Sequence, residues 1–109
     1  MYKPDRWVVI KVTDTETNEF LYRVFASWYG GYAGADSWQM NSGIVKVTEN
    51  GNYLEFHGNS GSIYQCHLNG YGTSMYGQSI LNNFTKNAKS VIVETLDENT
   101  DFLNMDYSK

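Results

Sequence analysis

The most reactive side chains in this sequence are one thiol and two imidazoles, Cys66, His57 and His67. A thiol nucleophile needs a base within hydrogen-bond reach, and a structural zinc site needs four ligands. If a turn is centred on Asn59-Ser60, His57 and Cys66 share a sheet face but stand about 13 Å apart at the usual rise per residue. His67 then points to the opposite face. This spacing predicts neither a cysteine nucleophile nor a metal site, and Cys66 is interpreted as a small buried apolar residue.

Carboxylates and serines give no stronger catalytic signal. General acid–base catalysis needs acids that converge in a pocket, and of the acids away from loops and tail ends only Asp36 and Glu55 fall in a region that could be concave. The serines at 41–43 and 58–61 belong to turn sequences and lack the Gly-x-Ser-x-Gly pattern of a nucleophile elbow. We therefore expect no catalytic residue and no cofactor. A small hydrolase that uses Asp36 or His57 is the least favoured interpretation.

Residues 28–38, WYGGYAGADSW, concentrate four aromatic residues and three glycines. Tyrosine and tryptophan are common anchors at binding interfaces because they bring large contact areas at a low cost in side-chain entropy. Two interpretations stay open: the rings form a platform for a ligand or partner, or they fold inward and fill one end of the domain. The candidate binding residues here are Trp28, Tyr29, Tyr32, Asp36 and Trp38.

The segment NGYGTS, residues 69–74, is a second candidate binding element. It leaves a predicted strand and enters a predicted helix, where free backbone amides and the helix dipole favour an anion. Gly70 and Gly72 would allow close approach of the backbone to a phosphate, with Thr73 and Ser74 beside them. The segment lacks the third glycine of a dinucleotide-binding fingerprint and the lysine of a P-loop. A tight strand-to-helix connection is the simpler interpretation.

The elements that would position these residues are mostly strands. Runs rich in β-branched and aromatic residues alternate in polarity and are separated by turn sequences, of which Asn50-Gly51 is typical of a two-residue type I′ hairpin. Strands are expected at residues 6–12, 20–28, 43–49, 52–57, 62–68 and 90–96.

One helix is expected between the last two strands, because four apolar residues there follow helical spacing. Thr73 or Ser74 is its predicted N-cap, and Lys86 and Lys89 suit the dipole at its other end. The order βββββαβ predicts an α+β domain, built as a bent antiparallel sheet or partly closed barrel of about six strands with one helix. The four apolar residues are Ile80, Leu81, Phe84 and Ala88.

The length of 109 residues predicts a single domain, assigned to residues 1–96, followed by an acidic C-terminal tail at 97–109. The net charge is −4, of which the tail with four acids and one lysine holds −3, so the remainder holds −1. A nearly neutral body is not expected to bind nucleic acid. The longest apolar run, residues 7–10, is too short to cross a membrane. One cysteine and no apolar leader favour a cytoplasmic protein.

Together with NSGI at 41–44 and HGNSGSIYQCH at 57–67, the stretch WYGGYAGADSW resembles small accessory proteins of tailed bacteriophages. The resemblance spans most of the chain up to the tail, has no defining motif and transfers no catalytic residue. It implies a role inside an infected bacterium, as an accessory or anti-defence factor.

We therefore expect a non-enzymatic binding protein that binds a host protein or sequesters a small anionic ligand such as a signalling nucleotide. The alternative is a minor virion or assembly component. An exposed sheet edge would also allow the chain to form a homo-oligomer.

Overall fold

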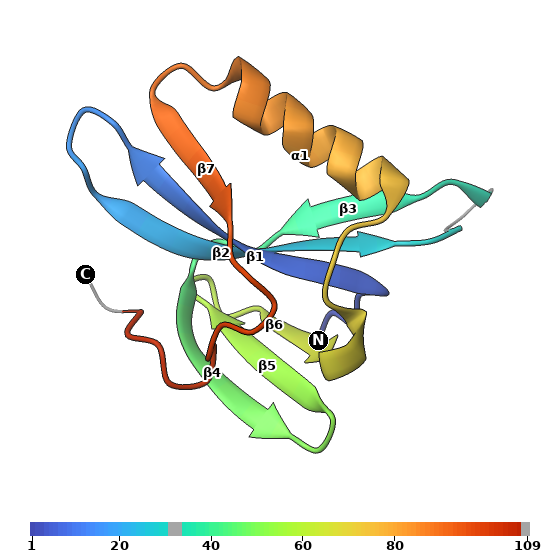
Figure 1. The fold of residues 1–109 in the computed structure, drawn as a ribbon. Coiled ribbons are helices and arrows are strands. Elements are labelled where there is room, and N and C mark those ends of the chain that lie inside the picture. The colour runs from blue at the N-terminus through green and yellow to red at the C-terminus, as the bar shows by residue number, and fades with distance from the viewer. Residues whose placement is uncertain (31–33, 108–109) are drawn as a thin grey trace.

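Two antiparallel sheets and one helix make up the computed structural model, which describes residues 1–30 and 34–107 (Figure 1). The larger sheet has the strand order β3-β2-β1-β7, and the smaller has the order β4-β5-β6. The larger sheet consists of β1 (Arg6–Asp14), β2 (Phe20–Trp28), β3 (Ser37–Met40) and β7 (Val91–Thr95). The smaller consists of β4 (Ile44–Asn50), β5 (Tyr53–Gly58) and β6 (Ile63–His67).

The helix α1 (Met75–Asn87) lies along one face of the larger sheet and follows a short 3-10 helix, η2 (Leu68–Gly70) (Figure 1). Ser74 is its N-cap, because the Ser74 hydroxyl accepts a 3.0 Å hydrogen bond from the amide of Gly77. A Cβ atom on Gly77 would lie 3.4 Å from the Ser27 hydroxyl and 3.5 Å from the Phe25 ring. The glycine weakens the helix but lets its first turn approach β2 closely.

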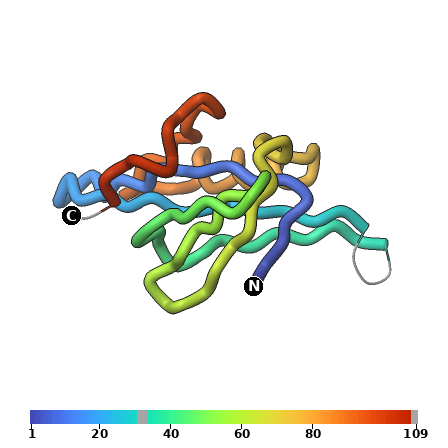
Figure 2. The backbone as a smooth tube through the Cα atoms, turned by 90° about the horizontal axis from the view of Figure 1, so that it is seen from below, coloured from blue at the N-terminus to red at the C-terminus, as the bar shows by residue number. Residues whose placement is uncertain are grey.

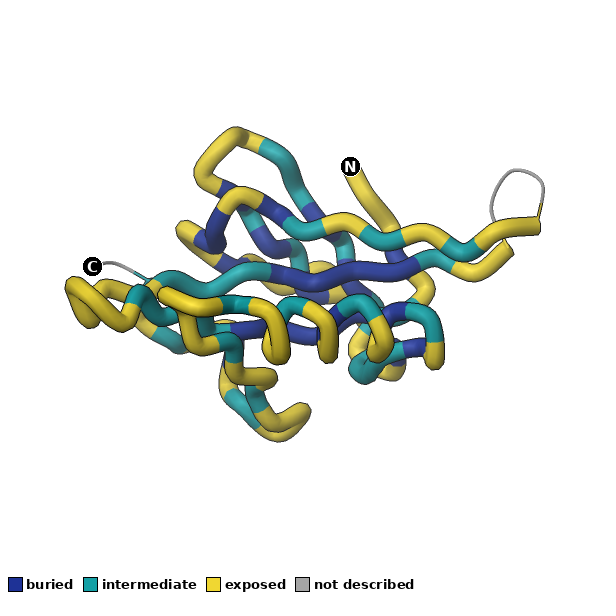
Figure 3. Tube along the Cα trace, turned by 90° about the horizontal axis from the view of Figure 1, so that it is seen from above, coloured by how far each residue is buried: buried dark blue, intermediate teal, exposed yellow. Residues whose placement is uncertain are grey.

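Each face of the larger sheet carries its own hydrophobic cluster. Neighbouring residues on β1 alternate, so Trp7 and Val9 face the smaller sheet while Val8 and Ile10 face α1. The longest buried runs of the chain lie within β1, at residues 7–10, and within β2, at residues 24–27, whereas most connections between elements are exposed (Figure 3). The cluster between the sheets also includes Val24, Phe56, Tyr64, Cys66 and Phe102, and the cluster under the helix includes Phe25 and Leu81.

The N-terminal residues lie beside the smaller sheet (Figure 2). The amide of Tyr2 donates to the carbonyl of Ile63 at 2.9 Å, and the amide of Gln65 donates to the carbonyl of Tyr2 at 2.7 Å. This short parallel bridge occupies part of the outer edge of β6.

The predicted α+β class and its single helix before the last strand are confirmed, whereas closure into a barrel is wrong. Residues 1–30 and 34–107 form seven strands in two separate sheets, with β3 as the additional strand. Asn41 explains the break between the sheets. The backbone amide of Asn41 donates to the Val24 carbonyl at 3.2 Å, and the side-chain oxygen of Asn41 accepts from the backbone amide of Val24 at 2.8 Å. The buried Asn41 therefore satisfies the backbone groups of Val24 where the β2–β3 pairing ends. After Asn41 the chain turns away from β2 and forms β4 of the smaller sheet.

Both hairpins of the smaller sheet differ from the predicted registers by one residue. Asn50 pairs with Tyr53, so the β4–β5 turn is centred on Gly51 and Asn52. Gly51 has a φ of 60° and Asn52 does not have a positive φ, as in a type II′ turn and not in the expected type I′ turn.

In the β5–β6 hairpin, Leu54 pairs with Cys66 and His57 pairs with Ile63. The connection is longer than expected, since the amide of Gly58 still donates to the carbonyl of Ser62 at 2.8 Å. His57 and Cys66 therefore point to opposite faces, which corrects the shared face predicted from the sequence.

The segment predicted as an acidic tail packs against the domain in residues 97–107. Phe102 is only 4% exposed, and its ring contacts Trp7, Phe56 and Tyr71. The segment thus supplies a core residue in addition to its charge. No helix in residues 1–30 and 34–107 is long and apolar enough to span a membrane.

Candidate functional site

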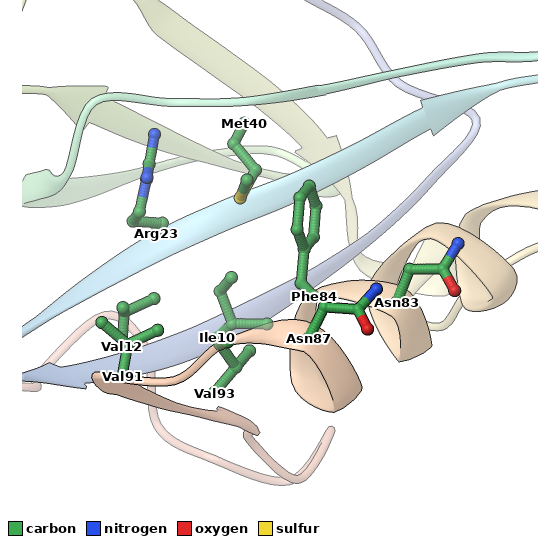
Figure 4. A pocket seen from close by; sticks show the side chains of 10 residues that line it. Ile10, Val12, Arg23, Met40, Asn83, Phe84, Asn87, Val91 and Val93 are labelled. Carbon is green, nitrogen blue, oxygen red and sulfur yellow. The ribbon is translucent and has the colours of Figure 1, made fainter. Parts of the chain in front are cut away.

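An open groove of about 570 Å³ lies between α1 and the larger sheet (Figure 4). It is mostly apolar, and residues of β1, β2, β3, β7 and α1 contribute to its lining. Its lining residues are Ile10, Val12, Arg23, Met40, Asn83, Phe84, Asn87, Ala88, Val91 and Val93.

The groove exists because α1 covers only part of the sheet face. Leu81 is 3% exposed and packs with Ile10 in the cluster under the helix. One turn later Phe84 is only half-buried, and the helix ends at Asn87. Val93 of the sheet, on the β7 side of the groove, therefore stays partly exposed. Figure 4 shows the valines of β1 and β7 on one side of the groove and Phe84 of α1 on the other.

Arg23 is the charged side chain among the described residues that line this groove. It lies on β2 opposite Ile10, on the side of the groove next to Met40 (Figure 4). Its Nε atom donates a 2.7 Å hydrogen bond to the carbonyl of Asn41, which orients the guanidinium. A guanidinium has five N–H donors, of which this bond uses one. The groove thus combines an apolar surface with one oriented cation.

Two of the predicted aromatic residues, Trp28 and Trp38, both line an open depression of about 500 Å³ at the β3 edge of the larger sheet, beside residues 1–3. Trp28 pairs with Ser37 and Trp38 pairs with Ser27, so the two indoles lie on opposite faces of the sheet. Trp38 stacks on Phe25, with ring centroids 5.6 Å apart and an angle of 12° between the planes. Trp28 instead donates from Nε1 to the carbonyl of Lys3 at 2.9 Å.

The loop between these tryptophans is held by two carboxylates. Asp36 accepts a 2.9 Å hydrogen bond from the amide of Gly30, and Asp5 accepts a 2.8 Å hydrogen bond from the amide of Tyr29. The side chain of Tyr29 is 53% exposed. Tyr32 lies outside the described residues. Asp36 therefore stabilises the loop through its hydrogen bond to Gly30, and the Trp38 ring packs against the core under the helix.

The NGYGTS segment makes a close connection between β6 and α1. Gly70 is buried, and a Cβ atom on it would lie 3.2 Å from the carbonyl of Asp5. Gly72 has a φ of 131°, and a Cβ atom on it would lie 2.6 Å from Nη2 of Arg6. The hydroxyl of Thr73 donates to Gln78 at 2.6 Å, while Ser74 caps the helix. The four predicted residues thus make close contacts within the chain and do not line the groove.

The outer face of the smaller sheet carries both histidines and a carboxylate, but its hydrogen bonds are local. Hydrogen bonds from Gln65 at 2.8 Å and Asn50 at 3.3 Å hold the pKa of Glu55 below its usual range. Nε2 of His57 lies 3.0 Å from the hydroxyl of Thr48. Within residues 1–30 and 34–107, no three or more histidines, cysteines or acids gather as metal ligands.

None of the residues that line the groove was predicted from the sequence as a binding residue. One signal was available: Arg23 is a lone charge in the strand FLYRVFASW, on the same face as Phe25. Because burying an unpaired charge is unfavourable, a cation on an apolar strand face indicates that the helix or sheet packed on that face leaves part of it exposed.

No protein-family model, curated protein or solved structure matches this chain. The structural class of the protein therefore rests on its fold and its groove alone. It is an α+β domain of two antiparallel sheets with an apolar groove beside its helix.

Proposed function

We propose that this protein is a non-enzymatic binding protein whose groove holds a small ligand with an apolar body and one anionic group. The observation that carries this proposal is the apolar groove with Arg23 in its wall. Small-molecule sites are typically concave and mostly apolar, with volumes of about 300–1,000 Å³ and a few placed polar groups. The groove has each of these properties.

The groove chemistry favours a carboxylate on an alkyl or aryl body over a polyphosphate. The body of such a ligand would pack on Val12, Val93 and Phe84, and its carboxylate would pair with Arg23. A nucleotide phosphate chain would bring several charges to a groove with one cation. A role as a bacteriophage accessory factor stays a prediction from the sequence resemblance.

A displacement titration tests this proposal. The fluorescent probe 8-anilinonaphthalene-1-sulfonate is bound to the purified protein and displaced by decanoate or by decanol. We expect decanoate to bind at least about tenfold more tightly than decanol, because a charge-assisted hydrogen bond to Arg23 is available only to the acid. Arg23→Gln should abolish this preference and leave decanol unchanged. Lys11→Gln, a charge loss on the opposite face of β1, is the matched control.

A second variant tests the location of the site. Ala88→Trp places an indole in the groove and should block both the probe and decanoate. Val45→Trp, at a position 53% exposed on β4, should bind both as the unmodified protein does. The proposal is overturned if neither compound binds, or if Arg23→Gln and Ala88→Trp leave decanoate binding unchanged in proteins that melt normally.

A further inference from the structure

The outer edge of β7 is the feature of this fold that remains without a role. β7 is the last strand of the larger sheet, in the order β3-β2-β1-β7. The amide of Leu96 donates to the carbonyl of Val9 at 2.9 Å, and the amide of Thr15 donates to the carbonyl of Ser90 at 3.0 Å. These pairs continue the β1–β7 register, so the even-numbered residues of β7 bond to β1. The N–H and C=O groups of Val91, Val93 and Thr95 therefore point outward.

β7 has few of the features that usually protect an edge strand. Natural edges carry charged side chains, especially lysine, or a proline or a bulge that prevents pairing with another chain, and of these β7 has one, the exposed Glu94. The sequence of β7 is VIVET, its register to β1 is unbroken, and Val91 and Ile92 are 36% and 50% exposed. Such an edge is a template for another strand.

We propose that β7 pairs with β7 of a second copy of this chain, antiparallel and about a two-fold axis through Val93. In this register Val93 lies opposite Val93 of the second copy, and Val91 lies opposite Thr95. These are the residues whose backbone groups point outward, so each such pair exchanges two hydrogen bonds. The whole strand is then paired.

The side chains favour this register over its neighbours. A shift in one direction places Glu94 opposite Glu94 of the second copy, which is unfavourable for like charges. A shift in the other direction leaves Thr95 outside the paired region. In the proposed register Glu94 lies opposite Ile92, and like charges do not face each other.

The same register also aligns opposite charges beyond the strand. Lys89 precedes β7 by two residues and Asp97 follows it by two residues, so each lies beside the other in the second copy. The two-fold axis creates this contact twice. Both residues are exposed, and their charges are complementary.

This pairing would complete the groove on its β7 side. A two-fold axis perpendicular to the sheet keeps both helices on one face, and Val91 and Val93 of each copy line the groove next to that axis. The second copy therefore extends the apolar wall where β7 now ends. The pairing rests on the geometry of the edge and does not require the proposed ligand.

Proline substitution tests the edge directly. The Thr95 amide points outward, so Thr95→Pro removes a donor to the second copy without removing a bond to β1. Native mass measurement and light scattering after size exclusion should show a dimer for the unmodified protein and for Thr95→Ala, and a monomer for Thr95→Pro. A monomeric unmodified protein at about 100 µM, a concentration at which weak but specific interfaces still associate, overturns the proposal.

Charge reversal tests the register. Lys89→Asp and Asp97→Lys each create two like-charge contacts and should raise the dimer dissociation constant at least about tenfold. Mixed together, the two variants should form a heterodimer in which every contact is again complementary. Lys86→Asp and Asp101→Lys are the matched controls and should dimerise normally. Failure of the mixture to restore the dimer overturns the register. Decanoate titration of the monomeric Thr95→Pro variant tests the groove separately.

Discussion

The hydroxyl of Tyr71 donates a 2.5 Å hydrogen bond to the carbonyl of Leu96 and thereby ties the β6–α1 connection to the end of β7. The same hydroxyl accepts a 3.3 Å hydrogen bond from the amide of Val9. Tyr71 thus stands between two backbone groups where the β1–β7 ladder ends. Its ring stacks on Phe102 with centroids 5.6 Å apart, so this residue also joins the C-terminal segment to the core.

Folding stability should fall steeply in alkali, and Tyr71 is one of four buried or half-buried groups in the described part of the chain that contribute, because burial raises the pKa values of Tyr64, Cys66, Tyr71 and Tyr107. Burial, with the nearby charges of Asp97 and Glu98, raises the pKa of Tyr71 above its ordinary value near 10. Below about pH 10 the Tyr71 phenol is protonated in both the folded and the unfolded chain, so its full contribution to folding stability is present. As pH rises above 10 the unfolded chain ionises first, so the free energy of unfolding decreases by up to about 1.4 kcal/mol per pH unit.

Tyr71→Phe should make this alkaline decrease shallower and lower stability at pH 7 by about 1–3 kcal/mol, because two backbone groups lose a partner. Urea unfolding at pH values from 7 to about 11, a range that brackets ordinary tyrosine ionisation, measures both effects. Tyr29→Phe, at a 53% exposed position, is the control. An unchanged alkaline slope in Tyr71→Phe would contradict this account.

Trp38 should behave as a core residue and Tyr29 as a surface residue. Trp38 stacks on Phe25 and meets the edge of the Phe84 ring, with centroids 5.3 Å apart. Trp38→Ala should lower the free energy of unfolding by about 2–3 kcal/mol, somewhat less than for a fully buried ring. Tyr29→Ala should change it by less than about 0.5 kcal/mol. Equal losses in the two variants would place Tyr29 in the core as well.

Removing the Phe102 ring should cost about 3–5 kcal/mol of stability, as for other buried aromatic side chains. Its ring fills a site between the two sheets, beside Trp7 and Phe56. Leu103→Ala, at a 37% exposed neighbour, is the matched control. Thermal melts distinguish the variants, and a Phe102→Ala protein that melts with the control would show that the C-terminal segment does not stabilise the fold.

The Cys66 thiol should be inert until the protein unfolds. Its residue is fully buried, and burial raises the pKa of the thiol, which suppresses the reactive thiolate. Alkylation by iodoacetamide in increasing urea should follow the unfolding transition. Ser60→Cys, at an exposed turn position, supplies the rate of an accessible thiol. Equal rates for the two cysteines in water would refute the assignment of Cys66 to the core.

Most elements were predictable because their signals are local. Alternation in FLYRVFASW identifies a strand, and the spacing of Leu81 and Phe84 after a capping serine identifies the helix. β3 was missed because SWQM is short and follows a glycine-rich segment. The hairpin registers were missed because moving a turn by one residue leaves the alternation within each strand unchanged, although it changes which residues pair across the hairpin.

The sequence by itself determined which side chains alternate on each strand, where the helix begins and that the class is α+β. Only the tertiary structure decided that Arg23, Val93 and Phe84 line one groove and that β7 is an edge strand. The physical reason is that alternation specifies a face for each residue but not the strand that lies beside it. Pairing across long stretches of chain depends on the packing of the whole molecule, and both proposed binding surfaces arise from that pairing.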